Sequence, residues 1–122
     1  MTHDPGQLRP TISTHVLDAE HGQPAEGVLV TLYRMSEDGR PQRIAQALTD
    51  TDGRVRDLLE RPLVAGDYRL EFELAGERAA GTGDPERFFR RLAVDLRIRD
   101  IGRSYHVPIL LGTYAMTTYR GS

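Results

Sequence analysis

The stretch DYRLEFEL, residues 67–74, alternates charged and apolar side chains at every position. Because successive side chains of a strand point to opposite faces of a sheet, this pattern predicts a half-buried antiparallel strand with one solvated face. Its apolar side chains are expected to face the core, and they are Tyr68, Leu70, Phe72 and Leu74. The stretch therefore favours an all-β fold.

Other segments extend this pattern along the chain. Residues 92–99 alternate in the same way, whereas residues 28–33 carry apolar side chains on both faces and predict a strand covered on both sides. Asp-Gly pairs at 38–39 and 52–53 are strong turn signals. Residues 75–90 are the one stretch that could form a brief helix, although glycines and a proline limit its length. Seven or eight short strands with such turns predict a β-sandwich.

The composition excludes several classes of function. The chain has 122 residues, 16 basic against 18 acidic side chains, and no cysteine. Nucleic-acid binders usually carry an excess of basic residues, whereas this chain has a net charge of −2. The absence of cysteine excludes disulfides, thiolate metal sites and a cysteine nucleophile. Because every basic residue is arginine, lysine-based Schiff-base chemistry is excluded as well.

The ends of the chain lead to expectations about its organisation and location. Residues 1–10 form a polar, flexible leader, and residues 11–122 form a single domain. The leader has no apolar stretch typical of a secretory signal, and no apolar run reaches the ~20 residues that span a bilayer. A cytoplasmic location is therefore expected.

The four histidines differ in their surroundings. His3 and His21 lie in polar segments, which favours exposed loop residues. His15 and His106 alternate with apolar residues, so each is expected on the outward face of a strand. They are candidates for one polar site on a covered surface. Periodicity alone leaves open that they are two unrelated surface histidines.

Four motifs carry a resemblance to a known family. They are THVLD with GQPAEGV at 14–18 and 22–28, TDGR at 51–54, YHVPILL at 105–111, and the closing tetrapeptide YRGS at 119–122. In this order they resemble the 5-hydroxyisourate hydrolases, which are transthyretin-related proteins of urate breakdown. The closing tetrapeptide is the most specific of the four.

This resemblance implies a transthyretin-like β-sandwich of eight strands with one short helix. It also implies a homotetramer, assembled as a dimer of dimers, with active sites at the interface between dimers. The resemblance also implies which positions of this chain form the site, some of them catalytic and others substrate-binding. The catalytic positions are His15, Arg54 and His106, and the substrate-binding positions are Tyr119, Arg120, Gly121 and Ser122.

The implied reaction hydrolyses the cyclic amide of 5-hydroxyisourate to 2-oxo-4-hydroxy-4-carboxy-5-ureidoimidazoline, without a cofactor. Either His106 or His15 would activate the water, because the histidine pKa of ~6.5 lies near working pH. Arg54 would polarise the attacked carbonyl. No metal is expected, because two histidines without nearby carboxylate or cysteine ligands make a weak zinc site. A Ser122 nucleophile is a further alternative, although no Ser-His-Asp arrangement can be read from the sequence.

Some positions depart from the family's usual pattern. The chain has Gly112-Thr113 where Ser-Pro is common, Met116 where a tyrosine hydroxyl is common, and Asp50 where asparagine is common. These changes bear on rate and specificity more than on the class of reaction.

Two non-enzymatic readings remain. The stretch from Val16 through Tyr68 also resembles β-sandwich modules of the carboxypeptidase-regulatory type, in which Arg54 would only build a turn and both histidines would be incidental. A transthyretin-like carrier of small molecules is the other.

Overall fold

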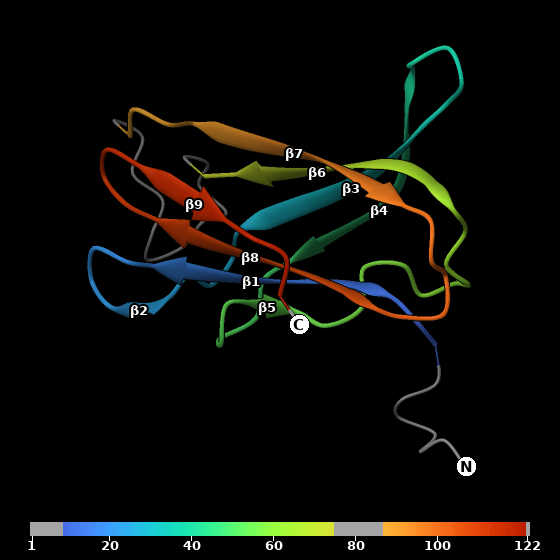
Figure 1. The fold of residues 1–122 in the computed structure, drawn as a ribbon. Helices are drawn as coiled ribbons and strands as arrows, with labels where there is room; N and C mark the ends of the chain where they lie inside the picture. The colour runs from blue at the N-terminus through green and yellow to red at the C-terminus, as the bar shows by residue number, and fades with distance from the viewer. Residues whose placement is uncertain (1–8, 75–86, 122) are drawn as a thin grey trace.

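The computed structural model describes residues 9–74 and 87–121 as two β-sheets packed face to face (Figure 1). The strands are β1 (Ile12–Asp18), β2 (Gln23–Pro24), β3 (Leu29–Met35), β4 (Pro41–Leu48), β5 (Arg54–Val55), β6 (Gly66–Glu73), β7 (Arg91–Ile98), β8 (Tyr105–Leu111) and β9 (Met116–Thr118). The predicted all-β sandwich is thus confirmed.

The two sheets differ in how their strands are connected. One sheet has the order β4-β3-β6-β7 with antiparallel neighbours throughout. The other has the order β2-β1-β8-β9, and β5 also pairs with β1. Within it β1 and β8 run parallel, although they are separated by most of the chain. This parallel pair brings the first motif and the third, residues 105–111, side by side.

The core lies between the sheets and is built mainly from aliphatic side chains. In β6 the expected alternation is observed, since Tyr68, Leu70 and Phe72 are buried and the residues between them are not. The core-facing positions of β1 and β8 are also buried, among them Ile12, Val16, Val107 and Ile109. The intervening positions of these two strands face the other side of the sheet, where Pro108 of β8 is buried as well.

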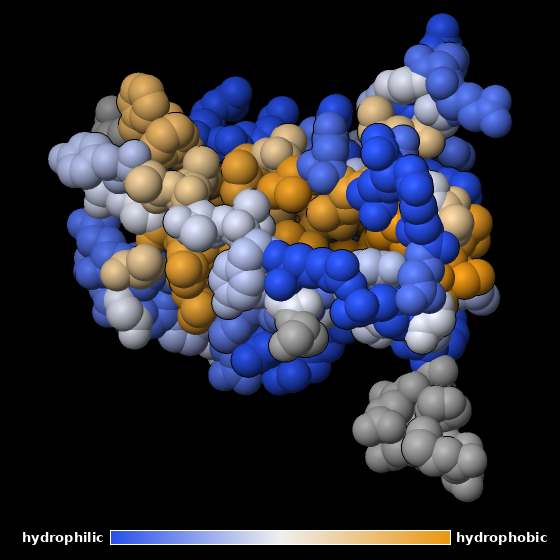
Figure 2. Space-filling view, viewed as in Figure 1, coloured by the Kyte–Doolittle hydropathy of each residue, from blue (hydrophilic) through white to orange (hydrophobic). Residues whose placement is uncertain are grey.

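Two strands show how position in the sheet modifies the pattern. Strand β3 lies between β4 and β6, and its outward-facing Thr31 is buried and accepts a hydrogen bond from Gln46 Nε2 at 2.9 Å. Strand β7 lies at the sheet's edge, so Val94 and Leu96 are only half buried. Figure 2 shows apolar side chains visible between the two layers in this view, where β7 and β9 face each other.

The strand count differs from the expected eight, whereas the expected helix falls mostly on residues that the structure does not describe. The described residues contain nine labelled strands, of which β2 and β5 are only two residues long. The stretch proposed for a helix, residues 75–90, falls mostly on 75–86, which lie outside the described residues, and residues 87–90 are not helical. Within the described ranges there is also no helix suited to cross a membrane.

Candidate active site

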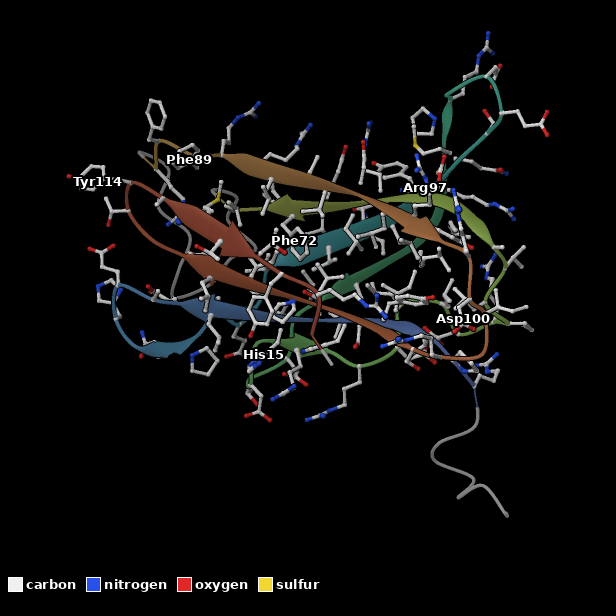
Figure 3. All side chains as sticks on the ribbon, viewed as in Figure 1. His15, Phe72, Phe89, Arg97, Asp100 and Tyr114 are labelled. Carbon is white, nitrogen blue, oxygen red and sulfur yellow. The ribbon has the colours of Figure 1, made fainter. Side chains whose placement is uncertain are left out.

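Three of the predicted site residues come together on the outer face of the sheet that contains β1. The register of β1 on β8 places Ser13 opposite His106. The register of β1 on β5 places His15 opposite Arg54. Paired residues in a sheet point to the same side, so residues far apart in sequence share one outward surface. Figure 3 shows His15 on this outer side of β1, close to β5.

A tight turn fixes Arg54 against β1. Gly53 has φ +78°, and a Cβ at this position would lie 2.3 Å from the carbonyl oxygen of Val16, so only glycine fits. The backbone N–H of Val16 donates to the carbonyl of Gly53 at 2.7 Å. The Asp-Gly signal thus serves to dock the turn on the neighbouring strand and to set the start of β5.

Asp50, which departs from the family's usual asparagine, stabilises the same turn. Its Oδ1 accepts hydrogen bonds from the backbone N–H groups of Asp52 at 2.8 Å and Arg54 at 3.0 Å. These bonds, that from Arg54 above all, hold the pKa of the Asp50 carboxyl below its usual value. The extra acidic group is therefore engaged with the Arg54 backbone.

His15 is held by a backbone carbonyl. Its Nε2 lies 2.8 Å from the carbonyl oxygen of Asp52. A carbonyl only accepts hydrogen bonds, so Nε2 carries the proton and donates it to this bond. In the neutral ring Nδ1 is then the nitrogen with a free lone pair.

His106 lies in a more enclosed and more positive environment. Its Nδ1 is 2.8 Å from Ser13 Oγ, and a hydroxyl can either donate or accept in such a bond. Burial, followed by the positive charges of Arg54 and His15, lowers the pKa of His106 below its usual value. The ring is therefore neutral at physiological pH and can accept a proton.

The carboxyl-terminal segment returns to His106. The backbone N–H of Gly121 donates to the His106 carbonyl at 2.7 Å, and a Cβ on Gly121 would approach His106 Cδ2 to 2.7 Å. Figure 1 shows the chain after β9 turning across β8 to this place. The Arg120 guanidinium stacks on the Tyr105 ring at 5.4 Å from its centroid. Tyr119 is exposed, and Ser122 lies outside the described residues.

Two hollows open beside the His106 ring. The larger, of about 820 Å³, is lined by Arg54 and His106 together with Ser13 and the turn that precedes β8. The smaller, of about 320 Å³, is lined by the second half of β7 and by Tyr119 and Arg120. Arg54 and the terminal segment therefore line different hollows, and His106 borders both.

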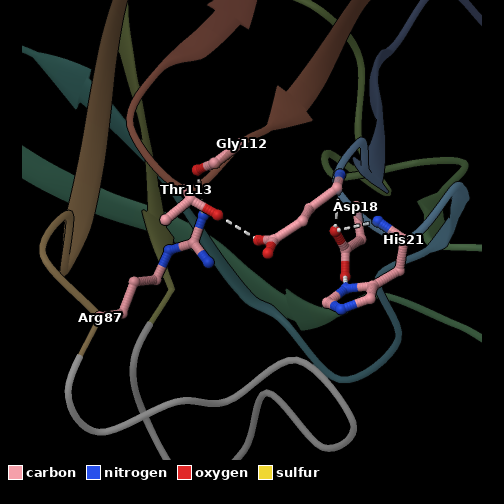
Figure 4. A network of polar contacts seen from close by, with 6 residues as sticks. Asp18, His21, Arg87, Gly112 and Thr113 are labelled. Carbon is pink, nitrogen blue, oxygen red and sulfur yellow. Dashed lines mark hydrogen bonds and ion pairs between the residues drawn. The ribbon is translucent and has the colours of Figure 1, made fainter.

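The one other histidine among the described residues, His21, does not reach this place. His21 lies beyond the far end of β1, where its Nδ1 is 2.7 Å from Asp18 Oδ2 (Figure 4). This carboxylate raises the pKa of His21, the reverse of the shift at His106. His3 lies outside the described residues. Met116 pairs with Leu111, also at the far end of β8, and packs on the core, so it borders neither hollow.

Sequence reasoning missed several residues around the two histidines. Ser13 was placed on the outward face of its strand, but its contact with His106 depends on the parallel pairing of β1 with β8. The Asp52 carbonyl that holds His15 is a backbone group and leaves no side-chain signal. Arg56 and Arg103 line the larger hollow, yet they look like ordinary surface arginines in the sequence.

Comparison with known proteins identifies the class to which this fold and site belong. Residues 12–121 match the family model described as HIUase/Transthyretin family. The 5-hydroxyisourate hydrolase 2 of Rhizobium meliloti is 44% identical over 117 residues, which cover 91% of this chain and 95% of the relative. The protein is a member of the HIUase/Transthyretin family.

Solved structures of a 5-hydroxyisourate hydrolase and of a transthyretin are both similar to this chain. The Klebsiella pneumoniae 5-hydroxyisourate hydrolase aligns with a TM-score of 0.78 and 35% identity, covering 93% of this chain and 99% of that one. Sea bream transthyretin, solved in complex with thyroxine, aligns with a TM-score of 0.79 and 28% identity, covering 90% and 93% respectively. The fold alone therefore does not separate an enzyme from a carrier.

Proposed function

We propose that this protein is a 5-hydroxyisourate hydrolase of urate catabolism. The observation that carries the proposal is the pairing of a neutral imidazole, His106, with the Arg54 guanidinium on the wall of one hollow. A hydrolase needs both a proton acceptor for water and a cation for the developing oxyanion. The high identity to relatives named 5-hydroxyisourate hydrolase supports the same substrate.

His106 is the general base of the proposed reaction. When Nδ1–H donates to Ser13 Oγ, Nε2 is free to accept a proton from the attacking water. The lowered pKa of His106 keeps this nitrogen unprotonated at neutral pH. Water oxygen then bonds to the carbonyl carbon of the cyclic amide, and the carbonyl electrons move onto oxygen.

Arg54 stabilises the oxyanion that results. Its guanidinium is permanently charged and offers several N–H donors in one plane. When the tetrahedral intermediate collapses, the carbon–nitrogen bond breaks and the nitrogen takes the proton held by the His106 imidazolium. The products of this step are a carboxylic acid, which releases its remaining proton to solvent and becomes a carboxylate, and an N–H group. No cofactor takes part in the proposal.

His15 and the terminal segment have supporting roles in the proposal. His15 is oriented by the Asp52 carbonyl and directs Nδ1 toward substrate or water. Tyr119, Arg120, Gly121 and Ser122 complete the substrate site, with Gly121 anchored on the His106 backbone.

The active form is proposed to be a homotetramer, a dimer of dimers with its sites at the interface between dimers. The support is that His15, Arg54 and His106 lie half exposed on an outer sheet face, where another subunit would enclose them. A sizing measurement should give four times the 13.7 kDa of the chain. A monomer that retains full activity would contradict the interface site.

The activity is tested by following 5-hydroxyisourate spectroscopically as soon as it is generated from urate. The purified protein should accelerate its decay beyond the spontaneous rate. Decay at the spontaneous rate, combined with binding of a thyroxine-like ligand, would instead favour a carrier like the thyroxine-bound sea bream protein. A protein that neither accelerates the decay nor binds the thyroxine-like ligand would favour a non-enzymatic module. The cytoplasmic location and the boundaries of the 1–10 leader and the 11–122 domain stay predictions.

A further inference from the structure

The larger hollow extends well past the proposed catalytic residues and is rich in positive charge. Its wall includes three arginines, Arg54, Arg56 and Arg103, against a single carboxylate, Asp100. Arg54 and Arg56 come from β5 and its extension, whereas Asp100 and Arg103 come from the turn between β7 and β8. Two segments distant in sequence thus contribute cations to one hollow.

Arg103 is held by its surroundings. Its guanidinium stacks on the Tyr105 ring at 5.7 Å from the centroid. The Tyr105 hydroxyl in turn donates to the carbonyl oxygen of Asp100 at 2.5 Å, which ties the ring to the turn. Asp100 Oδ1 also accepts from the N–H of Gly102 at 2.8 Å and closes the turn. A side chain restrained in this way loses less entropy when it binds an anion.

The positive charge of the hollow is poorly neutralised. In the described parts of the chain, no carboxylate lies within ion-pair distance of the guanidinium of Arg54 or Arg103. Arg56 is paired with Asp52, but at 3.7 Å and in an exposed position. Burial is the main cause of the lowered pKa of His106, and the positive charge of Arg54 adds to it. An anion entering the hollow would meet unpaired donors.

We propose that Arg103, assisted by Arg56, forms an accessory anion subsite that binds the oxygen-rich edge of a planar heterocyclic anion and guides it to His106. The planar fork of arginine matches adjacent oxygen and nitrogen atoms on such a ring. The volume of about 820 Å³ accommodates a bicyclic ring together with water. This inference rests on the proposed function for the reaction that follows, but binding of the anion is testable without it.

Urate, a stable planar heterocyclic anion, is the probe for this subsite. Its affinity is measured by isothermal titration calorimetry on the assembled full-length protein. Arg103→Gln should weaken binding about three- to fivefold, the range of a partly exposed ion pair, and Arg103→Glu about tenfold or more. The matched control is Arg43→Gln on β4 of the opposite sheet, which removes the same charge and should leave affinity unchanged.

Asp100→Asn tests the subsite by a gain of affinity. The substitution removes the one carboxylate of the wall, while the amide oxygen can still accept the hydrogen bond from Gly102 N–H. Urate should bind about two- to threefold more tightly. Thermal unfolding of each variant is recorded in parallel, so that a loss of fold is not mistaken for a loss of the subsite.

The kinetic signature is a split between capture and turnover. In Arg103→Gln, kcat/KM should fall several-fold while kcat stays near the wild-type value. The difference in kcat/KM between wild type and variant should become smaller at high salt, because exposed charges are then screened. A folded Arg103→Gln protein that binds urate as tightly as Arg43→Gln would overturn the subsite, whatever its activity. If the wild type fails to hydrolyse 5-hydroxyisourate but its urate affinity still depends on Arg103, the subsite stands and the proposed function fails.

Discussion

Two histidines, His21 in the turn after β1 and His106 on β8, have opposite electrostatic surroundings. His21 follows the end of β1 and contacts the Asp18 carboxylate, which raises its pKa. His106 lies near the start of β8, where burial and the charges of Arg54 and His15 lower its pKa. One imidazole is therefore stabilised as a cation, and the other is kept neutral. The comparison shows that burial and neighbouring charge, more than the residue type, distinguish a proton acceptor from a structural contact.

The largest expected effect separates the two histidines by activity. His106→Gln removes the proposed base and should lower kcat/KM for 5-hydroxyisourate by about 10² or more. His21→Gln is the matched control and should leave the rate unchanged, because His21 touches only the Asp18 turn. Equal rates for the two variants in the decay assay would remove His106 from the mechanism.

Removal of the cation beside His106 should have a comparable cost. Arg54→Gln retains some hydrogen-bonding capacity but loses the charge that faces the oxyanion, so kcat should fall by about 10². Arg69→Gln is the control, since that guanidinium is paired with Asp95 across β6 and β7 at 2.7 Å, on the opposite sheet. Full activity of Arg54→Gln would assign Arg54 to the turn alone.

The contact of the terminal segment with His106 should have a smaller effect. In Gly121→Ala the new methyl group would lie 2.7 Å from His106 Cδ2, so the segment or the ring must shift. Misplacement of a catalytic group by a fraction of an ångström predicts a loss of about tenfold in kcat, with little change in the unfolding temperature. A variant with normal kcat would show that the closing contact does not position His106.

The smallest effects are the two pKa shifts themselves, read by NMR titration of the imidazole signals. His106 should titrate below ~6.5 and His21 above it. Asp18→Asn should return His21 toward its ordinary value and leave His106 and the activity unaffected. If both rings titrate together near the ordinary value, the electrostatic contrast between the two places is wrong.

The same shifts make opposite contributions to stability. As the pH falls, the unfolded chain binds a proton at His106 before the folded chain does, because the folded pKa is the lower of the two. The contribution of His106 to the free energy of unfolding is therefore lost as the pH falls from ~6.5 through the lower folded pKa. For His21 the folded form binds the proton first, so its contribution is present below ~6.5 and is lost as pH rises through the raised pKa.

Much of the fold could be read from local periodicity. The alternation in β1, β6 and β8 assigned the core-facing side chains correctly, because one face of each strand is buried. The turn at Gly53 was recognised by its Asp-Gly pair, because only glycine adopts its backbone conformation there without a clash. Strand β7 alternates as clearly in sequence, but its position at the edge of the sheet leaves most of its inward residues only half buried.

The sequence by itself determined the all-β class, the core-facing residues and, through its motifs, the family and the set of candidate side chains. Only the tertiary structure decided which of them meet. The pairings of β1 with β8 and with β5 join segments separated by tens of residues, and no local pattern encodes such register. Ser13 against His106, and Arg103 beside Arg54 in one hollow, are products of that register. The electrostatic surroundings of His106 follow from the same long-range pairing, because charges act through space. His21, by contrast, meets Asp18 only three residues away in the chain.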